Sequence, residues 1–330
     1  MNHNAITVDN LTKRYRTRVK DEGLGAGIRA LIRPQCREVE AVRGVTFAVE
    51  RGEMLAFIGP NGAGKSTTIK MMTGILHPTS GQLQVLGYDP VRQRRLLCPR
   101  IGTVFGQRSQ LWMHLPPVDS FAMIGAIYEI PDDVRRKRVD ELAQRFDLGS
   151  FLNTPVRKLS LGQRVRCEIA ASLLYEPDVL FLDEPTIGLD VVVKQAIREL
   201  ILQWNAERGV TVFLTSHDPG DVERICRRAV VIDHGSIVLD QSVDSLKVNY
   251  LNRKVIEVKF AEPKCMVPMA GVTAEGQGAQ WRLTVDTLSR PIGEVIQAVT
   301  AAGGVADITV IDPPMEEIIA AIFTAKEASA

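Results

Sequence analysis

The segment GPNGAGKS, residues 59–66, constrains the fold of this 330-residue chain more than any other feature. It matches G-x-x-x-x-G-K-[ST], follows a continuous apolar run that ends at Ile58, and opens a helix-like stretch at Lys65. In such a loop the glycines let the backbone approach a ligand closely, and free N–H groups at the helix N-terminus face an anion. The sequence therefore predicts that the N–H groups of residues 61–66 surround a phosphate, that Lys65 reaches the phosphate oxygens, and that Ser66 ligates Mg²⁺.

Two adjacent carboxylates follow another apolar run. In DVLFLDEPT, residues 178–186, the apolar positions 179–182 predict a buried strand, and Asp183 and Glu184 stand at its carboxyl end. Ligand sites of open α/β sheets lie at that edge, so both carboxylates are expected beside the phosphate loop. Asp183 is expected to hold Mg²⁺ through water, and Glu184 to polarise the water that attacks a γ-phosphorus.

Short apolar runs alternate with helical segments through most of the chain. Besides the two runs above, VTVFLTSHD and RAVVIDHG are apolar and end in charged or turn residues. This alternation predicts an α/β fold with a mainly parallel sheet. From about residue 107 to 174 the pattern is mostly helical, which predicts a helical insert in that domain.

The end of the chain has a different pattern. From about Asn249 onward, Ile256, Val258 and Phe260 alternate with polar residues, a helical apolar stripe covers residues 292–299, and a last helix is expected near residues 318–323. We therefore predict a small α+β domain over residues 249–330, and a nucleotide-binding domain over residues 1–248.

Residues 17–40 form a second segment outside the α/β pattern. Leu24, Ile28 and Leu31 share one helical face, and basic residues accompany them. An amphipathic basic helix can lie on an anionic membrane surface or against a membrane-protein helix. It can equally cover the core of its own domain, and the residues leave these alternatives open.

Composition excludes several classes of protein. The formal net charge is +1, so no field over the whole chain attracts nucleic acid. No uncharged apolar run approaches the ~18–20 residues that span a bilayer, and the polar N-terminus lacks a signal-peptide core. The five cysteines are scattered without a CxxC pair, which favours buried reduced thiols over disulfides or a zinc site.

These segments, in this order, resemble the nucleotide-binding subunit of the ABC transporter superfamily over roughly residues 5–245. GPNGAGKST looks like the Walker A segment and VLFLDEP like the Walker B segment, while LTKRYR, VFGQ, GLD and TSHD are similar to four further motifs. The resemblance implies a P-loop ATPase that binds ATP and Mg²⁺. It also implies nucleotide contacts along the whole Walker A segment, which comprises Gly59, Pro60, Asn61, Gly62, Ala63, Gly64, Lys65, Ser66 and Thr67.

The resemblance assigns roles to four more residues. Tyr15, in LTKRYR, would stack on adenine. Gln107, which ends VFGQ, would be the amide that senses Mg²⁺ and the attacking water. Asp190 would belong to the D-loop, and His217, in TSHD, would face the γ-phosphate.

The segment LSLGQR, residues 159–164, places another possible phosphate contact far from the first loop. Ser160 and Gln163 fit the capping box S-x-x-Q, and Leu161 is spaced to pack as a helix residue. By itself this pattern predicts only a well-capped helix. It also resembles the family signature S-G-G-Q, with Leu161 in place of the first glycine and Gly162 retained. The resemblance implies that Ser160, Gly162 and Gln163 face the ATP held by a second, head-to-tail subunit.

The segments TSGQLQVLGYDP, GQRSQLW and LPPVDSF resemble the ATPases of type-2 ABC exporters. That branch implies an integral-membrane permease and a second ATP-binding subunit, most simply another copy of this chain, as partners. It also implies a peripheral place at the cytoplasmic face of the cell membrane and no nucleic-acid partner. Some polysaccharide exporters of the branch carry a gate helix where this chain has residues 17–40, which favours a permease contact for that segment.

Two alternatives belong to other classes. A soluble ABC-type ATPase acting on ribosomes or DNA would usually carry two ATPase units or a long coiled coil. This chain has one phosphate loop and no long heptad run. A P-loop kinase or GTPase would lack the LSLGQR and TSHD segments.

Overall fold

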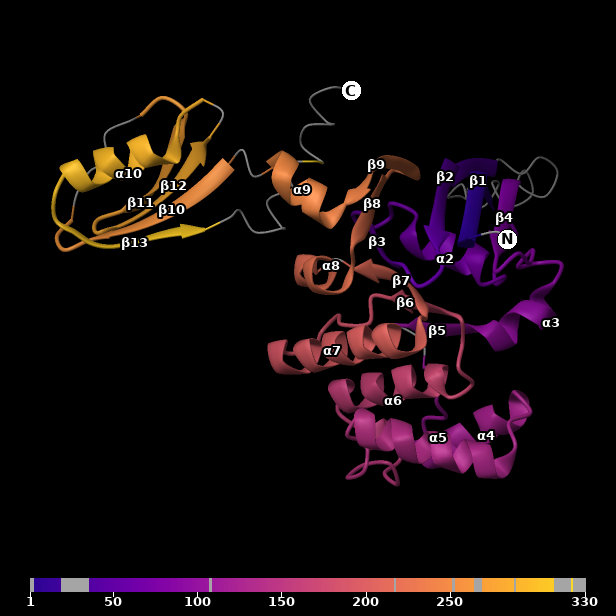
Figure 1. Cartoon of the computed structure of the whole chain (residues 1–330). Helices are drawn as coiled ribbons and strands as arrows, with labels where there is room; N and C mark the ends of the chain where they lie inside the picture. The colour runs from indigo at the N-terminus through magenta and orange to yellow at the C-terminus, as the bar shows by residue number, and fades with distance from the viewer. Residues whose placement is uncertain are drawn as a thin grey trace, which may run out of the picture. The chain divides into compact units, whose positions relative to one another are not determined.

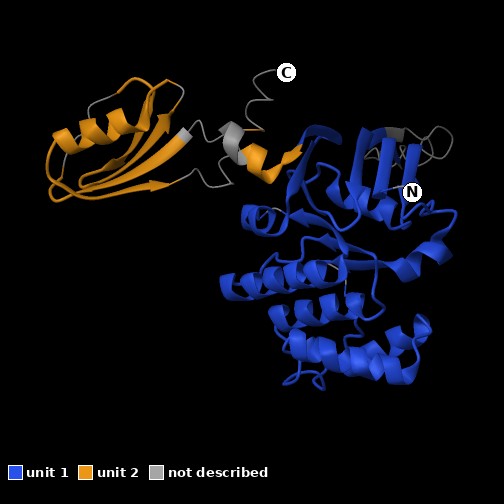
Figure 2. Cartoon of the chain, viewed as in Figure 1, with its two compact units in different colours: residues 1–240 blue, residues 241–330 orange. Residues whose placement is uncertain are grey.

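The chain divides after Asp240 into two units, residues 1–240 and 241–330, which Figure 2 colours separately. The computed structural model describes residues 3–18, 36–106, 109–216, 218–250, 253–263, 269–287, 289–311 and 322. The division lies somewhat before residue 248, where the sequence placed the end of the first domain.

A six-stranded sheet forms the centre of unit 1 (Figure 1). Its strand order is β5-β6-β7-β3-β8-β9. The strands are β3 (Met54–Ile58), β5 (Ile101–Phe105), β6 (Val179–Asp183), β7 (Thr211–Ser216), β8 (Arg228–Asp233) and β9 (Ser236–Ser242). The pairs β5–β6, β6–β7, β7–β3 and β3–β8 are parallel. Every residue of β3 and β7 is buried, as their continuous apolar sequences require when both faces of a parallel sheet are covered.

An antiparallel sheet of order β2-β1-β4 completes the strands of unit 1. It consists of β1 (Asn4–Arg18), β2 (Cys36–Glu50) and β4 (Ser80–Val85). Its buried face shares one apolar core with the parallel sheet, because Phe47 of β2 lies 5.6 Å from Phe57 of β3 between ring centroids. The pairing of β1 with β2 continues to Arg18 and Cys36, so both ends of the predicted 17–40 insert are strand. Its predicted helix lies outside the described residues.

The helices of unit 1 flank these sheets. They are α2 (Lys65–Met72), α3 (Arg94–Leu97), α4 (Pro117–Ile127), α5 (Asp132–Arg145), α6 (Leu161–Leu173), α7 (Val191–Arg208) and α8 (Pro219–Ile225), with 3-10 turns η1 (Cys98–Arg100) and η2 (Val156–Lys158). In the described part of the predicted helical insert, residues 109–174, the structure has α4, α5, η2 and α6 and no strand. Among the residues described, no helix has both the length and the apolar character needed to cross a membrane.

Unit 2 is an antiparallel sheet of order β11-β12-β10-β13 with a helix packed on one face (Figure 1). It comprises α9 (Val243–Tyr250), β10 (Arg253–Phe260), β11 (Val272–Gln277), β12 (Gln280–Asp286), α10 (Ile292–Ala301) and β13 (Val305–Ile311). The alternating Ile256, Val258 and Phe260 are buried together with Val295 and Val299 of α10, which gives this unit a core of its own. The fold thus has the α/β core with a mainly parallel sheet that the sequence predicts, followed by a small α+β unit.

Two of the three cysteines whose burial the structure describes are buried thiols. Cys167 and Cys226 are buried and Cys98 is half-buried, and all three are free. Burial raises the pKa of Cys167 to about 12, so its thiol stays protonated and unreactive at neutral pH.

Candidate nucleotide site

The loop between β3 and α2 can form only because several of its residues lack a side chain. Gly62 and Gly64 have φ values of +82° and +109°, in the region that favours glycine. A Cβ on Gly64 would lie 2.5 Å from the carbonyl oxygen of Ala41, and one on Gly59 would lie 2.2 Å from that of Ile232. Gly62, in contrast, faces open space. The loop is therefore packed closely on its inner side and open where a ligand would approach.

The ammonium of Lys65 lies inside this loop. Its Nζ donates to the carbonyl oxygens of Gly59, at 2.6 Å, and Pro60, at 3.1 Å. It also lies 3.9 Å from Oε1 of Glu184. Burial lowers the pKa of Lys65, and the neighbouring Glu184 and Asp183 carboxylates oppose that shift. A buried cation held by two carbonyls of a glycine-rich loop can exchange them for the oxygens of a phosphate.

Asp183 joins three elements at the carboxyl edge of the sheet. It ends β6, and its Oδ1 accepts hydrogen bonds from Ser66 Oγ of α2 at 3.2 Å and from Thr215 Oγ1 of β7 at 2.7 Å. A cleft of about 180 Å³ opens beside it, and Lys70, Phe105, Glu184 and Ile187 line that cleft. The sequence predicted the meeting of Ser66 with Asp183, but it gave Thr215 no role.

Glu184 has a backbone conformation that is rare outside glycine, with φ at +55°. Its N–H donates to the carbonyl oxygen and to Oγ1 of Thr215, at 3.0 and 3.2 Å. Because a left-handed conformation persists only when its surroundings hold it, Thr215 fixes where the Glu184 carboxylate projects. That carboxylate is about one-fifth exposed, as a group that meets water must be.

The oxygens of Ser66 and Asp183 fit a magnesium ion that keeps several water or phosphate ligands of its own. Hydroxyl and carboxylate oxygens are hard donors, and Mg²⁺ needs only one or two of them from the protein. Among the described residues no group of three or more His, Cys, Asp and Glu side chains could hold a metal ion.

The predicted capping box is present at the start of α6. Ser160 Oγ accepts from the N–H of Gln163 at 3.2 Å, and Gln163 Oε1 accepts from the N–H of Ser160 at 2.9 Å. Leu161 is the first residue of this helix and is 38% exposed, and its Cδ2 would lie 3.2 Å from a Cβ placed on Gly188. Only from the second turn onward does the helix bury its apolar face, as at Ile169.

Gly162 lies where α6 packs against α7. A Cβ at Gly162 would lie 2.9 Å from Cγ1 of Val193, in the first turn of α7. Asp190 caps that turn, because its Oδ1 accepts from the N–H of Val193 at 2.9 Å. Val191 and Val192 beside it are 76% and 79% exposed. In Figure 1 α6 lies between α7 and the pair α4 and α5, whereas α2 lies by the antiparallel sheet. The Ser160 and Lys65 loops are therefore carried by different parts of the same unit.

Three further predicted site residues have a different outcome. Gln107 and His217 lie outside the described residues. Tyr15 is half-buried in β1 opposite Val39, and Nζ of Lys13 lies 5.2 Å from the centre of its ring. The structure leaves part of this ring accessible, and its contact with adenine stays a prediction.

Comparison with known proteins gives consistent matches. The family model described as ABC transporter matches residues 42–187. The daunorubicin resistance ATP-binding protein DrrA3 of Streptomyces coeruleorubidus is 30% identical over 324 residues, which cover 95% of this chain and 94% of that protein. The Nod factor export ATP-binding protein I of Ralstonia nicotianae is 34% identical over 227 residues, which cover 69% and 70% of the two chains. The dimeric structure of MJ0796, a bacterial ABC transporter cassette, matches with a TM-score of 0.60 at 25% identity, and covers 72% of this chain and 98% of that one.

Proposed function

The chain belongs to the ATP-binding subunits of the ABC transporter family, and from that premise we propose that two copies hold ATP between them and hydrolyse it at the cleft described above. As such a subunit, the chain binds and hydrolyses ATP to drive transport. The match to transporter subunits favours this function over that of an ATPase acting on ribosomes or DNA. The observation that carries the proposed site is the approach of Lys65 to within 3.9 Å of Glu184, at the strand edge where Ser66 meets Asp183.

The phosphate loop binds the nucleotide. Residues 61–66 offer their N–H groups to the phosphates, and the Lys65 ammonium leaves the carbonyls of Gly59 and Pro60 to meet phosphate oxygens. The whole segment from Gly59 to Thr67 thus serves as the phosphate site, and Tyr15 as the adenine contact. Ser66 and Asp183, joined by a hydrogen bond of 3.2 Å, hold Mg²⁺. When bound, that ion neutralises charge on the phosphates.

Glu184 acts on the water that attacks the γ-phosphorus. Its carboxylate is partly exposed and lies at the end of β6, so it can orient that water and accept its proton. We assign Gln107 and His217 to the same step, on the resemblance of their segments to the family motifs.

The N-terminus of α6 completes the site of the other copy. The capping box orders Ser160 and Gln163 on the exposed end of the helix, where the remaining free N–H groups suit an anion. Gly162 and the Asp190 cap tie this end to α7. This arrangement explains why phosphate-facing residues occur in two distant parts of the sequence. The dimeric state of the MJ0796 cassette supports it.

The proposed partners and location follow the branch. Names of two relatives refer to daunorubicin resistance and to Nod factor export. They support export through a separate membrane permease, with this subunit at the cytoplasmic face of the cell membrane. The exported compound is set by contacts in the permease.

The substitution Glu184→Gln tests the proposed site. The amide keeps the shape of the side chain but cannot accept a proton, so steady-state ATPase should fall by ~10²-fold or more. ATP binding, measured by titration with a fluorescent ATP analogue, should persist, and ATP-bound dimer should accumulate in size-exclusion chromatography. Glu199→Gln is the matched control, because Glu199 is an exposed carboxylate on α7. An ATPase rate of Glu184→Gln above about a tenth of wild type would rule out the base role.

A further inference from the structure

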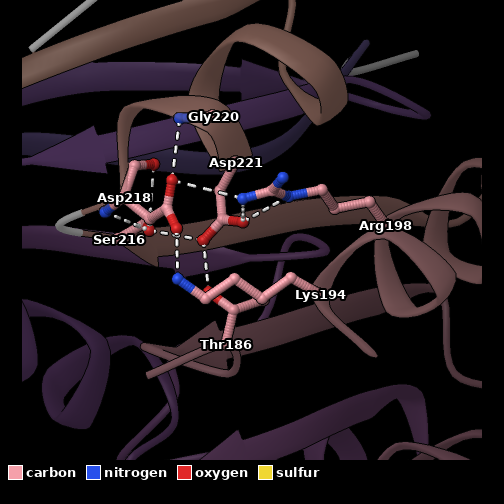
Figure 3. Close-up of polar contacts among 7 residues, drawn as sticks. All are labelled: Thr186, Lys194, Arg198, Ser216, Asp218, Gly220 and Asp221. Atoms are coloured by element: carbon pink, nitrogen blue, oxygen red, sulfur yellow. Dashed lines mark hydrogen bonds and ion pairs between the residues drawn. The ribbon is translucent and has the colours of Figure 1, made fainter. Parts of the chain in front are cut away.

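The carboxylate of Asp221, in α8, is fully buried and accepts hydrogen bonds from three side chains (Figure 3). Its Oδ2 accepts from Thr186 Oγ1 at 2.5 Å and from Ser216 Oγ at 2.6 Å. Its Oδ1 accepts from Nε of Arg198 at 2.7 Å, and a second guanidinium nitrogen lies equally close. A buried carboxylate with this many donors is held in one geometry.

Asp218 extends the same cluster. Its N–H donates to Ser216 Oγ at 2.9 Å, and its carboxylate accepts from Lys194 Nζ at 2.5 Å and from the N–H of Gly220 at 2.9 Å. Arg198 also reaches this carboxylate, at 3.2 Å, so the guanidinium bridges Asp218 and Asp221. Burial opposes ionisation of Asp218, but the Lys194 ammonium and the Gly220 N–H outweigh it and lower its pKa.

The cluster joins the segments that carry the proposed hydrolysis residues. Thr186 lies two positions after Glu184, and Ser216 and Asp218 are the chain neighbours of His217 on either side. Lys194 and Arg198 are one turn apart on α7, the helix that Asp190 caps and that packs on Gly162. One set of contacts thus ties Thr186, two positions after Glu184, and Ser216, at the end of β7, to Arg198 of α7.

Stability alone does not account for the cluster. Desolvating a guanidinium and a carboxylate costs about as much as their attraction returns, so an apolar set of similar volume would hold the helices as well. A charged set can instead select a single relative position of the chain segments that it joins. Glu184 needs neighbours that hold its position, because its backbone is in a left-handed conformation. Thr215 holds it on one side. On the other side Asp221 holds Thr186, two positions further along the chain.

We propose that Asp221 is a positioning residue for ATP hydrolysis, which acts by fixing Thr186 and Ser216 against Arg198 of α7. The inference rests on the proposed function, because it takes Glu184 as the group that is positioned. Asp221 belongs to no segment that we assign to phosphate binding, so its effect should fall on turnover and leave nucleotide binding unchanged.

Two variants at Thr186 and one at Asp221 test this positioning. Thr186→Val removes the hydroxyl at nearly constant volume, whereas Thr186→Ser keeps the hydroxyl and removes a buried methyl group. Asp221→Asn removes the charge opposite Arg198. We expect kcat to fall about tenfold or more in Thr186→Val and Asp221→Asn, since a displacement of ~1 Å can cost ~10²-fold, with the KM for ATP within about twofold of wild type. Thr186→Ser should retain most of kcat.

The matched control is Asp240→Asn. Asp240 receives two hydrogen bonds of 2.6 Å from Arg228 at the β8–β9 pair, so this variant also removes a carboxylate charge from an arginine, in a pair that is more exposed than Arg198 and Asp221. It should keep wild-type kcat. Thermal melting of all four variants shows whether each is folded at the assay temperature.

The inference is wrong if Thr186→Val keeps wild-type kcat, or if Thr186→Ser loses as much as Thr186→Val, because the effect would then follow packing. It is also wrong if KM rises and kcat does not change, which would make the cluster part of nucleotide binding. Should Asp221→Asn unfold, the Thr186 pair alone decides the question. A fully active Glu184→Gln would overturn the proposed role of Glu184 in hydrolysis, and an inactive Glu184→Gln beside a fully active Thr186→Val would overturn only the positioning role.

Discussion

At the scale of single residues, the buried carboxyl of Glu168 in α6 holds the segment that follows Gln107. Ser109 Oγ donates to one of its oxygens, and the N–H of Gln110 donates to the other at 3.1 Å. The side-chain amide of Gln110 also donates to the backbone carbonyl of Glu168, at 2.7 Å. Burial raises the pKa of Glu168, and the bonds from Ser109 and Gln110 only partly offset that shift.

This raised pKa predicts a particular dependence of stability on pH. Between the ordinary glutamate value of 4.5 and the raised pKa, the folded protein binds a proton that the unfolded chain releases. The free energy of unfolding therefore falls as pH rises through that window. Glu168→Gln lacks this titration, so its melting temperature relative to wild type should increase as pH is raised from about 4 to about 8.

Differential scanning fluorimetry across that pH range checks the prediction. Glu199→Gln, in the exposed part of α7, is the control for the loss of a glutamate side chain as such. A constant difference between Glu168→Gln and wild type at all pH values would mean that Glu168 ionises as easily in the folded protein as in the unfolded chain.

The sequence predicted some site residues and not others for a physical reason. Lys65, Ser66 and the Asp183–Glu184 pair lie in contiguous motifs, each next to an apolar strand, and strand ends in a parallel sheet meet at one edge. Thr215 and Asp221 act through contacts with residues about thirty positions away in the chain, at Glu184 and Thr186. Their residue types are common, so only the folded structure identifies their partners. The position of Thr215 in the TSHD segment, at the end of a strand, was the one feature of the sequence that could have indicated a role for it.

At the scale of elements, α6 and α7 approach each other closely at a point where α6 has a glycine and therefore no side chain. Gly162 is the second residue of α6, and a methyl group there would lie 2.9 Å from Val193. Alanine favours a helix over glycine by up to ~1 kcal/mol, whereas forcing an extra methyl into a packed contact costs ~1–3 kcal/mol. Gly162→Ala should thus be neutral or destabilising in the wild type, and stabilising in a Val193→Ala background.

Urea unfolding of the two single variants and the double variant measures this coupling, which should be ~1 kcal/mol. Gly293→Ala is the matched control, because Gly293 is likewise the second residue of a helix, α10, and a Cβ there would face open space. Its effect should add to that of Val193→Ala. If the effects of Gly162→Ala and Val193→Ala on the free energy of unfolding add within ~0.5 kcal/mol, residue 162 does not restrict how closely the two helices pack.

The elements that the sequence predicted are those with a clear apolar pattern. The continuous runs of β3, β6, β7 and β8 were found, as was the alternation in β10. Strand β4 has four exposed residues of six, and β11 is exposed at every position but one. Strands β5 and β9 also went unassigned. Exposed strands such as β4 and β11 form because a neighbouring strand offers hydrogen bonds, and the periodicity of apolar residues cannot indicate such a neighbour.

At the scale of the whole molecule, each unit has its own apolar core, one built on Phe47, Phe57 and Phe213 and the other on Ile256, Val258 and Phe260. The proposed ATP site lies entirely in unit 1. Its lesions divide into two classes in a symmetric dimer. In the proposed arrangement, Lys65 and Glu184 serve the nucleotide bound by their own chain, while Ser160 serves the nucleotide bound by the partner.

Mixing inactive variants tests this account most directly. In a heterodimer of Lys65→Ala with Ser160→Arg, one site carries both lesions and the other carries neither. In a heterodimer of Lys65→Ala with Glu184→Gln, each site carries one lesion, so this mixture is the matched control. Subunit exchange is verified with two fluorescent labels before ATPase is measured.

The account predicts that each variant alone is inactive and that the first mixture regains ATPase. The regained rate should reach up to about a quarter of wild type, since random exchange makes half of the dimers mixed and each has one intact site. The second mixture should stay inactive. If the first mixture also stays inactive although exchange is complete, the site is not shared between two copies of this chain, and the central claim is wrong.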